Sequence, residues 1–283
     1  MTSSGTFQHR AKVALRGSLL TPIGKVLGAP TVHISSPITR GGNYLYYWMW
    51  AYTRDTERRP VRVLHHEVID DWLDEFPLVN HLSIRRGEAS TLFSEWIGEH
   101  RHYFGQSFSR SELEGFCTAL VESSPSFRAR LDAARAWIGP DTCVLNVRRG
   151  DYYVYPELTA MYGLDIEQHV TRSIDILRRH GRAVDDVVIV SDDVAWCLEH
   201  IAPLLPGRMR VVQDRTSMFD DLAVLASART MILANSTFSF WGGYLASVIQ
   251  TDHLAVAPEY HFIDESGQRH RDPYDPRWVI AEA

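Results

Sequence analysis

Two adjacent arginines follow an apolar run near the middle of the chain, in the stretch VLNVRRGDYY at residues 144–153. Guanidinium groups stay charged at any working pH, and their forked N–H donors match the oxygens of a phosphate group. Arg148 and Arg149 can therefore bind an anion and stabilise negative charge that develops on it. Because arginine pairs are also common in solvated loops, the surrounding elements must decide between the two interpretations.

Two further apolar runs also end in polar side chains. Asp192 follows VVIVS, whereas Ser236 and Thr237 follow MILAN and open an apolar helical pattern. The first N–H groups of a helix lack partners within it and carry the positive end of its dipole, so a helix start favours an anion. Asp192 and Ser236 can equally act as simple helix caps.

The pattern of the second half predicts that these three points meet. Apolar runs alternate with helical patterns, which predicts strands at 142–147, 186–193, 209–214, 230–235 and 253–260. The helices between them are expected at 165–181, 194–201, 218–228 and 236–249. Alternation of this kind predicts a parallel sheet covered on both faces. Such sheets bind ligands beyond the carboxyl ends of their strands, where the arginines and the aspartate stand.

The first half is less regular. Strands are expected at 31–36 and 61–66. A glycine-rich turn leads into an aromatic helix within 39–55, whose aromatic side chains fit either domain core or stacking against the rings of a ligand. Ser111 and Glu114 have the spacing of a capping box, and a second helix is expected to begin at Ser124-Pro125 and to end at Gly139. A second arginine pair, at 85–86, lacks a strong preceding strand and is expected on the surface.

Composition sets the outer bounds. The 283 residues, 45% hydrophobic and 23% charged, are typical of a globular enzyme of one large or two medium domains. A net charge of -6 argues against a protein that coats nucleic acid. The three cysteines form no metal-binding cluster, so no metal is expected. No apolar run is long enough to span a membrane; the basic start of the chain is compatible with peripheral membrane contact, and a cytoplasmic location is expected.

Taken together, NVRRGDY, VSDD and FDDLAVLASARTMILANSTFSFWGGYLA resemble the α-1,2-fucosyltransferases of glycosyltransferase family 11. The three motifs occur in the family's order within residues 142–250. RGGNYLYYWMWAY, at residues 40–52, is similar to the family's amino-terminal turn and helix, with Gly42 and Asn43 matching and Tyr44 in place of a glutamine.

The resemblance implies an α/β, GT-B-like fold with two Rossmann-like parallel-sheet domains facing a cleft. The expected division is a flexible lead-in at 1–30, an acceptor-side domain at 31–138 and a GDP-sugar-binding domain at 139–283. The implied reaction moves L-fucose from GDP-fucose to a glycan hydroxyl, with inversion, without metal or other cofactor, and as a galactoside α-1,2 linkage. The implied partners are GDP-fucose and an oligosaccharide or glycan acceptor.

The resemblance also implies roles for individual residues. Arg148 would bind the β-phosphate and stabilise the leaving group, and Arg149 would support it by pairing with Asp151 or another carboxylate. An inverting transfer needs a base for the acceptor hydroxyl, for which Asp151 and Glu157 are the candidates. The residues expected to bind the donor are Asn43, Asn146, Arg149, Asp192, Asp220, Asp221, Ser236, Thr237 and Ser239.

Within that set, Asp220 or Asp221 would read the guanine base, Asp192 would have a similar nucleotide-side role, and the three hydroxyl residues would donate to phosphate oxygens. Asn146 stands where the family has histidine, and an amide cannot take a charge or pass a proton as imidazole does. Two alternatives therefore stay open: a transferase that uses another GDP-sugar, and a non-catalytic protein that binds a nucleotide-sugar.

Overall fold

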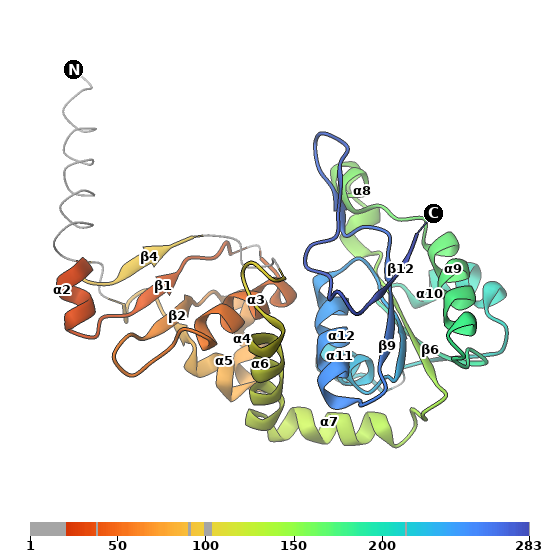
Figure 1. Ribbon diagram of the computed structural model, residues 1–283, viewed down its shortest axis with the longest axis horizontal. Helices are drawn as coiled ribbons and strands as arrows, with labels where there is room; N and C mark the ends of the chain where they lie inside the picture. The colour runs from red at the N-terminus through yellow and green to blue at the C-terminus, as the bar shows by residue number, and fades with distance from the viewer. Residues whose placement is uncertain (1–20, 38, 90–91, 99–103, 213, 283) are drawn as a thin grey trace. The chain divides into compact units, whose positions relative to one another are not determined.

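The computed structural model of the chain describes residues 21–282 apart from 38, 90–91, 99–103 and 213 (Figure 1). The described chain forms two compact units that divide between Arg101 and His102. Each unit is built on a main sheet whose strands are all parallel, with helices in the connections. The expected α/β, GT-B-like class with two Rossmann-like parallel sheets is confirmed.

Unit 1 contains a four-stranded sheet in the order β3-β2-β1-β4. Its strands are β1 (Thr31–His33), β2 (Val61–Leu64), β3 (Ser83–Ile84) and β4 (Glu95–Ile97). The helices are α2 (Thr21–Val26), α3 (Gly41–Tyr52), α4 (Asp70–Glu75) and α5 (Pro77–His81). The sheet order reverses between β1 and β4, so the loop that leads from β1 into α3 starts at the switch point of this sheet.

Helix α3 forms the core of unit 1. Every side chain from Tyr44 to Ala51 is buried, as expected for a helix that is apolar around its whole circumference. The first residue of the helix, Gly41, must be glycine because a side chain there would overlap Trp72: an added Cβ would lie 2.0 Å from the indole Nε1. Of the two interpretations of the aromatic run, the structure supports domain core.

Unit 2 contains a six-stranded sheet in the order β12-β9-β8-β5-β6-β7. Its strands are β5 (Cys143–Val147), β6 (Asp186–Ser191), β7 (Arg208–Val211), β8 (Thr230–Ile232), β9 (Leu254–Pro258) and β12 (Val279–Ala281). Numbered along the chain, these strands stand in the doubly wound order 3-2-1-4-5-6, which reverses between β5 and β8. Five of the six strands overlap the predicted ones, and β12 was not predicted.

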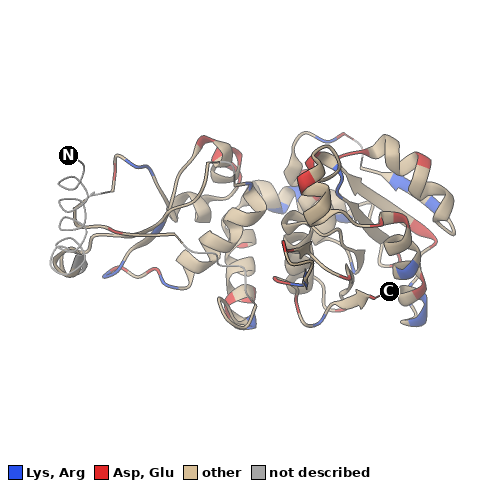
Figure 2. Cartoon of the chain, turned by 90° about the horizontal axis from the view of Figure 1, so that it is seen from above, with Lys and Arg blue, Asp and Glu red and all other residues tan. Residues whose placement is uncertain are grey.

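Helices cover both faces of this sheet, with α11 and α12 on one side and α9 and α10 on the other (Figure 1). Their bounds are α8 (Pro156–Tyr162), α9 (Ile166–Arg179), α10 (Val194–Trp196), α11 (Met218–Ala226) and α12 (Thr237–Ile249). A π-helical turn, Cys197–Ile201, continues α10, and β10 (Phe262–Ile263) pairs with β11 (Arg269–His270) in an antiparallel hairpin. Acidic and basic residues are both spread over the helices and loops of this unit (Figure 2).

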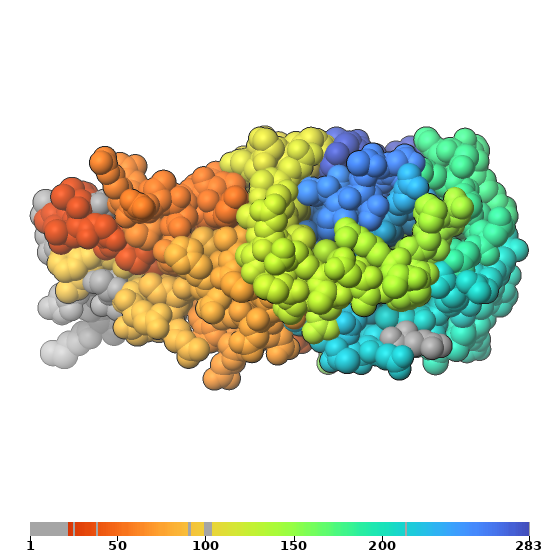
Figure 3. All heavy atoms as spheres, turned by 90° about the horizontal axis from the view of Figure 1, so that it is seen from below, coloured from red at the N-terminus to blue at the C-terminus, as the bar shows by residue number. Residues whose placement is uncertain are grey.

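Two helices before β5 also belong to unit 2. Helices α6 (Arg110–Ser123) and α7 (Pro125–Arg135) pack against α12 and α11, and Phe116 meets Trp241 edge to face with ring centroids 5.7 Å apart. Figure 3 shows α6 and α7 in yellow and yellow-green on the surface beside the blue α12. Because of this packing the units divide at 101/102, earlier than the expected 138/139. Residues 1–20 of the expected lead-in lie outside the described part of the chain, and α2 follows them.

The expected start of α6 was wrong by two residues. The capping box is formed by Ser109 and Glu112, not by Ser111 and Glu114, so the helix begins at Arg110. The start of α7 is confirmed, because the Ser124 side chain accepts a hydrogen bond from the Phe127 N–H and Pro125 occupies the first turn.

A buried ion-pair cluster ties α6 to the segment that precedes β12. The fully buried carboxylate of Asp275 accepts hydrogen bonds from both terminal nitrogens of Arg110, at 2.7 and 3.0 Å, and from Arg277 Nη2, at 3.0 Å. Burial opposes ionisation, but the hydrogen bonds from the two guanidinium groups outweigh it and lower the pKa of Asp275. In the described part of the chain, no helix combines the length and the apolar character needed to cross a membrane.

Candidate active site

The loops after β5, β6 and β8 share one edge of the unit 2 sheet. β5 pairs with β6 on one side and with β8 on the other, all in parallel. The carboxyl ends of the three strands therefore lie side by side at the point where the strand order reverses. The arginine pair, Asp192 and the start of α12 lie together at this edge, as the sequence predicted.

Arg148 lies between two carboxylates. Its Nη2 donates to Asp151 Oδ1 at 2.5 Å, and its Nη1 lies 2.7 Å from Asp192 Oδ2. The ring centroid of Tyr152 is 5.5 Å from the guanidinium carbon, so the aromatic face lies under the charge. With 35% of its side chain exposed, Arg148 is oriented by its neighbours and still accessible to a ligand.

Arg149 is a support. Its backbone N–H donates to Asp192 Oδ1 at 2.9 Å, and its Nε donates to Asp193 Oδ2 at 3.0 Å. Its guanidinium carbon lies 4.1 Å from the ring centroid of Trp196 and 4.7 Å from that of Tyr153. Asp193 is thus the carboxylate that pairs with Arg149, whereas Asp151 pairs with Arg148.

Gly150 permits this arrangement. Its φ of +29° lies in the region that favours glycine, and an added Cβ would stand 2.6 Å from Asp192 Oδ2 and 3.3 Å from the guanidinium carbon of Arg148. A side chain here would separate Asp192 from Arg148.

The Gly150→Ala variant is therefore expected to bind pyrophosphate about tenfold more weakly or worse, because displaced charge-assisted hydrogen bonds are each worth about 1.5–3 kcal/mol. Isothermal titration measures the effect. Gly267→Ala is the matched control: Gly267 also has a positive φ, +83°, but an added Cβ there meets nothing within 4 Å. Equal pyrophosphate affinity in the two variants would show that the crowding at residue 150 does not matter.

The two aspartates at the start of α11 differ sharply. Asp220 completes a capping box with Ser217 and accepts from the Thr216 and Ser217 N–H groups, the Thr216 hydroxyl and Arg130. Burial opposes ionisation, but these hydrogen bonds prevail and lower the pKa of Asp220. Both of its carboxylate oxygens therefore already accept hydrogen bonds around the start of α11.

Asp221 keeps an open acceptor. One of its oxygens pairs with Arg215, while Oδ1 is buried and has no hydrogen-bond partner among the described residues. Burial raises the pKa of Asp221 to about 6, against the lowering effect of Arg215. Arg215 also donates to the Ser191 carbonyl at 3.1 Å, which fixes the pair beside the end of β6. Of the two predicted base readers, Asp221 is the one with an unpaired oxygen, and that oxygen is buried.

The start of α12 presents backbone donors and two of the three predicted hydroxyl groups. Ser236 occupies the N-cap position without a side-chain capping bond, and Thr237 is the first helical residue. Ser239 was expected to donate to phosphate, but it is fully buried and its Oγ accepts from the Ala234 N–H at 3.0 Å. Ser239 therefore holds the turn after β8, and the anion-binding features left at this helix are its first N–H groups, Ser236 and Thr237.

The remaining predicted residues are less central. Asn146 is buried on β5 and donates from Nδ2 to the Val190 carbonyl at 2.9 Å. Glu157 is exposed in the first turn of α8 and takes no part in the hydrogen bonds around Arg148. Asn43 is half-buried in the first turn of α3, at the switch point of the unit 1 sheet. Arg85 and Arg86 are exposed, as expected.

Sequence reasoning missed Trp196 and Arg215. Trp196 lies three residues after Asp193, one helical turn away, and Asp193 accepts from its N–H at 3.1 Å. A tryptophan one helical turn after VSDD could have indicated that an aromatic ring packs against the arginine pair. Arg215 precedes α11 in an irregular loop, and no pattern in the sequence pointed to its pairing with Asp221. Among the described residues, no group of three or more His, Cys, Asp or Glu side chains is placed to hold a metal ion.

Comparison with known proteins gives consistent matches. The family model "Glycosyl transferase family 11" matches residues 83–282. An alpha-1,2-colitosyltransferase of Escherichia coli is 27% identical over 141 residues, which cover 49% of this chain and 47% of that protein. The O-antigen biosynthesis glycosyltransferase WbnK of Escherichia coli is 28% identical over 127 residues, which cover 43% of this chain and 39% of that protein. The match thus spans less than half the length of these curated relatives.

A solved structure of POFUT1 in complex with GDP is also similar. It aligns with a TM-score of 0.46 at 10% sequence identity, over 90% of this chain and 99% of that one.

Proposed function

The chain belongs to glycosyl transferase family 11, and on that premise we propose that it is an inverting fucosyltransferase. It would move L-fucose from GDP-fucose to a hydroxyl group of an oligosaccharide or glycan, as a galactoside α-1,2 linkage, without a metal ion. The observation that carries the proposal is Arg148, held between Asp151 and Asp192 at the switch point of a doubly wound sheet.

The proposed chemistry is electrostatic. When the C1–O bond of the donor breaks, the electron pair stays with the β-phosphate, which gains negative charge. Arg148 would donate to that phosphate as the charge grows, and the first N–H groups of α12, with Ser236 and Thr237, would bind further phosphate oxygens. Arg149, clamped by Asp193 and Trp196, would keep the loop after β5 in place, and Asp192 would orient Arg148.

The base of the nucleotide would be read by Asp221. Guanine offers two adjacent donors, N1–H and N2–H₂, and a carboxylate with an open oxygen can accept from them. Oδ1 of Asp221 is such an oxygen, and Arg215 holds the other one. Asp220 is already saturated by the cap of α11.

The Asp221→Asn variant is expected to bind GDP about tenfold to a hundredfold more weakly while its weaker binding of UDP stays unchanged, because hydrogen bonds to a charged acceptor contribute about 1.5–3 kcal/mol. Titration of both nucleotides measures the ratio. Asp220→Asn is the control, since it weakens the helix cap without touching the open oxygen. GDP affinity of the native protein should also rise as pH increases through about 6, where Asp221 ionises. Identical GDP and UDP affinities in the native protein would refute the base reading.

The acceptor hydroxyl must lose its proton during the transfer, and Asp151 and Glu157 are the proposed bases. Asp151 lies beside Arg148, whereas Glu157 is exposed on α8. Asn43, at the switch point of the unit 1 sheet, is proposed to contact the sugar or the acceptor. The kcat values of Asp151→Asn and Glu157→Gln, with GDP affinity unchanged, would identify which of the two removes the proton.

A second candidate differs in the donor sugar. It is favoured by the relative named for colitosyl transfer, which is 27% identical over 141 residues. Mass spectrometry of a glycan panel incubated with GDP-fucose tests both: a mass increase of one fucose supports the first candidate. Tight GDP binding with neither transfer nor slow hydrolysis of GDP-fucose would instead support another donor or a non-catalytic binder, and repetition with other GDP-sugars would separate these two.

A further inference from the structure

One edge of unit 1 carries exposed apolar and cationic side chains that the proposed reaction does not use. Helix α2 leads into β1, and the loop at 53–60 leads into β2. Because β1 and β2 are parallel, both segments lie at the edge where the strands begin. The loop before α3, with Asn43 beyond it, lies at the opposite edge.

The apolar part is one face of α2. Ile23 and Val26 of α2 and Leu27, the next residue, are 48%, 87% and 70% exposed. The Leu27 N–H donates to the Ile23 carbonyl at 3.0 Å, so the helical turn continues to Leu27 and the i, i+3, i+4 spacing groups the three side chains. Gly24 fixes the helix from another side, since an added Cβ would stand 2.1 Å from the Phe93 carbonyl oxygen. The helix is thus anchored to unit 1 while its three largest apolar side chains face outward.

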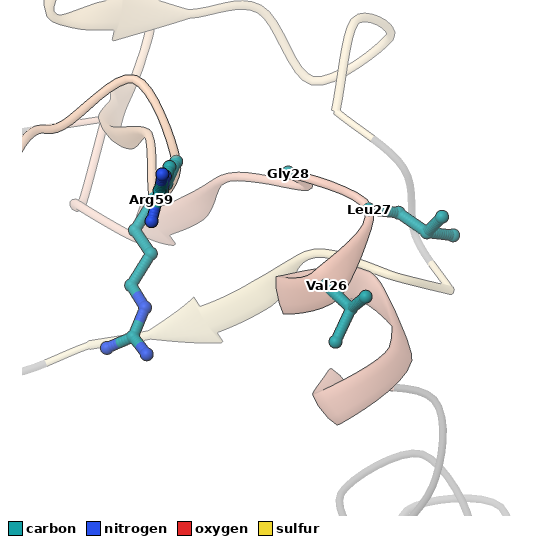
Figure 4. Close-up of a pocket in the computed structure, with 5 residues that line it drawn as sticks. Val26, Leu27, Gly28 and Arg59 are labelled. Atoms are coloured by element: carbon teal, nitrogen blue, oxygen red, sulfur yellow. The ribbon is translucent and has the colours of Figure 1, made fainter.

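The cationic part lies next to this face. Arg58 and Arg59, both exposed, line a hollow of about 620 Å³ together with Val26, Leu27 and Gly28 (Figure 4). Two acids stand in the same loop: Asp55 is engaged by Arg62 at 2.6 Å, and Glu57 is exposed. The exposed charge of residues 57–59 is therefore positive.

The sequence of this edge has the same sign. The protein carries a net charge of -6, yet its first acidic residue is Asp55. Of the six basic residues before it, Lys25 stands in α2 and Arg54 in the loop at 53–60, whereas Arg40 precedes α3 at the opposite edge. A cationic segment in an acidic protein favours an anionic partner. Because apolar side chains lie beside the arginines, that partner must also offer an apolar region next to its anionic groups. A bilayer with anionic headgroups has that structure, and nucleic acid does not.

We propose that the surface formed by Ile23, Val26, Leu27, Arg58 and Arg59 docks the protein on an anionic lipid bilayer. The three apolar side chains enter the boundary between headgroups and acyl chains, and the arginines bind lipid phosphates beside them. The opposite edge of the sheet, which bears Asn43, then faces away from the lipid. The docking does not depend on which sugar or nucleotide the protein uses.

Flotation of the full chain with vesicles tests the proposal. We expect binding to phosphatidylcholine vesicles that contain phosphatidylglycerol, little binding to pure phosphatidylcholine, and a loss of binding as salt screens the charges. The double variant R58Q/R59Q should lower the partition coefficient about thirtyfold, at about 1 kcal/mol for each arginine near such a surface. The double variant V26S/L27S should lower it at least about tenfold.

Leu198→Ser is the matched control, because Leu198 is comparably exposed but belongs to unit 2, and it should bind as the native chain does. Unchanged Tm values show that the variants fold, and unchanged hydrolysis of GDP-fucose in solution separates the docking from the chemistry. Failure of the native chain to bind the anionic vesicles, or native-like binding by both double variants, overturns the proposal. Association with a protein partner in the absence of vesicle binding overturns it as well.

Discussion

Replacing Arg148 by alanine is expected to lower kcat for transfer from GDP-fucose by at least about a hundredfold, which corresponds to about 3 kcal/mol of transition-state stabilisation. The reason is the position of the guanidinium: it is oriented by Asp151 and Asp192 and still partly exposed where the leaving group would lie. Removing it leaves the two carboxylates facing the phosphate, so repulsion adds to the lost attraction. Initial rates of GDP release at saturating donor measure the change.

Two companion variants make this result specific. Arg148→Lys keeps the positive charge but loses the forked donors, so its rate should fall between those of the native protein and the alanine variant. Arg86→Ala removes an exposed arginine from the similar RRG stretch in unit 1 and should leave the rate unchanged. A native rate in Arg148→Ala would place the active site elsewhere.

Replacing Asp275 by alanine is expected to lower the free energy of unfolding by about 3 kcal/mol. Breaking a buried ion pair from one side typically costs about 3–5 kcal/mol, and the lower end applies because Arg110 and Arg277 can regain some water. Urea denaturation with an unchanged m-value measures the loss. Asp252→Ala is the control, since the Arg182–Asp252 pair is exposed and its removal should have a much smaller effect.

The same cluster predicts a pH dependence. Because the pKa of Asp275 is lowered in the folded state, the carboxylate contributes stability above its unfolded pKa of about 3.9. That contribution is lost as pH falls through the lower, folded-state pKa. The stability difference between the native chain and Asp275→Ala should therefore shrink in acid. A difference that stays constant down to the lowest pH at which both fold would contradict the assignment.

The regular part of the fold could be predicted because its signals are local. Buried parallel strands appear as short apolar runs, so β5, β6, β8 and β9 were found within a few residues of their bounds. β12 was missed because the hairpin of β10 and β11, and no helix, stands between β9 and β12, so the alternation of strands and helices stops at β9. The capping box was misplaced because Ser109 with Glu112 and Ser111 with Glu114 have the same spacing, and only packing distinguishes the two.

The sequence predicted where the site lies but not which side chains pair with one another in it. Topology alone placed Arg148 and Asp192 at one edge, because parallel neighbours end together. Whether Asp220 or Asp221 keeps an unpaired oxygen depends on Arg130, which stands in α7, and on the course of the irregular loop that carries Arg215. Ser239 Oγ accepts from the Ala234 N–H because the turn after β8 brings the two atoms together. The residue types in this turn do not show how closely the two atoms approach.

The pair of carboxylates around Arg148 also bears on which solutes bind at this edge of the sheet. In the resting protein this cation already has its counterions, built into the loops after β5 and β6. A chloride ion or a single weak acid meets a charge that the two carboxylates already offset, so we expect it to bind weakly. A diphosphate carries more negative charge, and it can bind the guanidinium N–H groups that the carboxylates leave free together with the start of α12. We therefore expect Asp151 and Asp192 to make the site selective for highly charged anions with several oxygens over the abundant small anions of a cell.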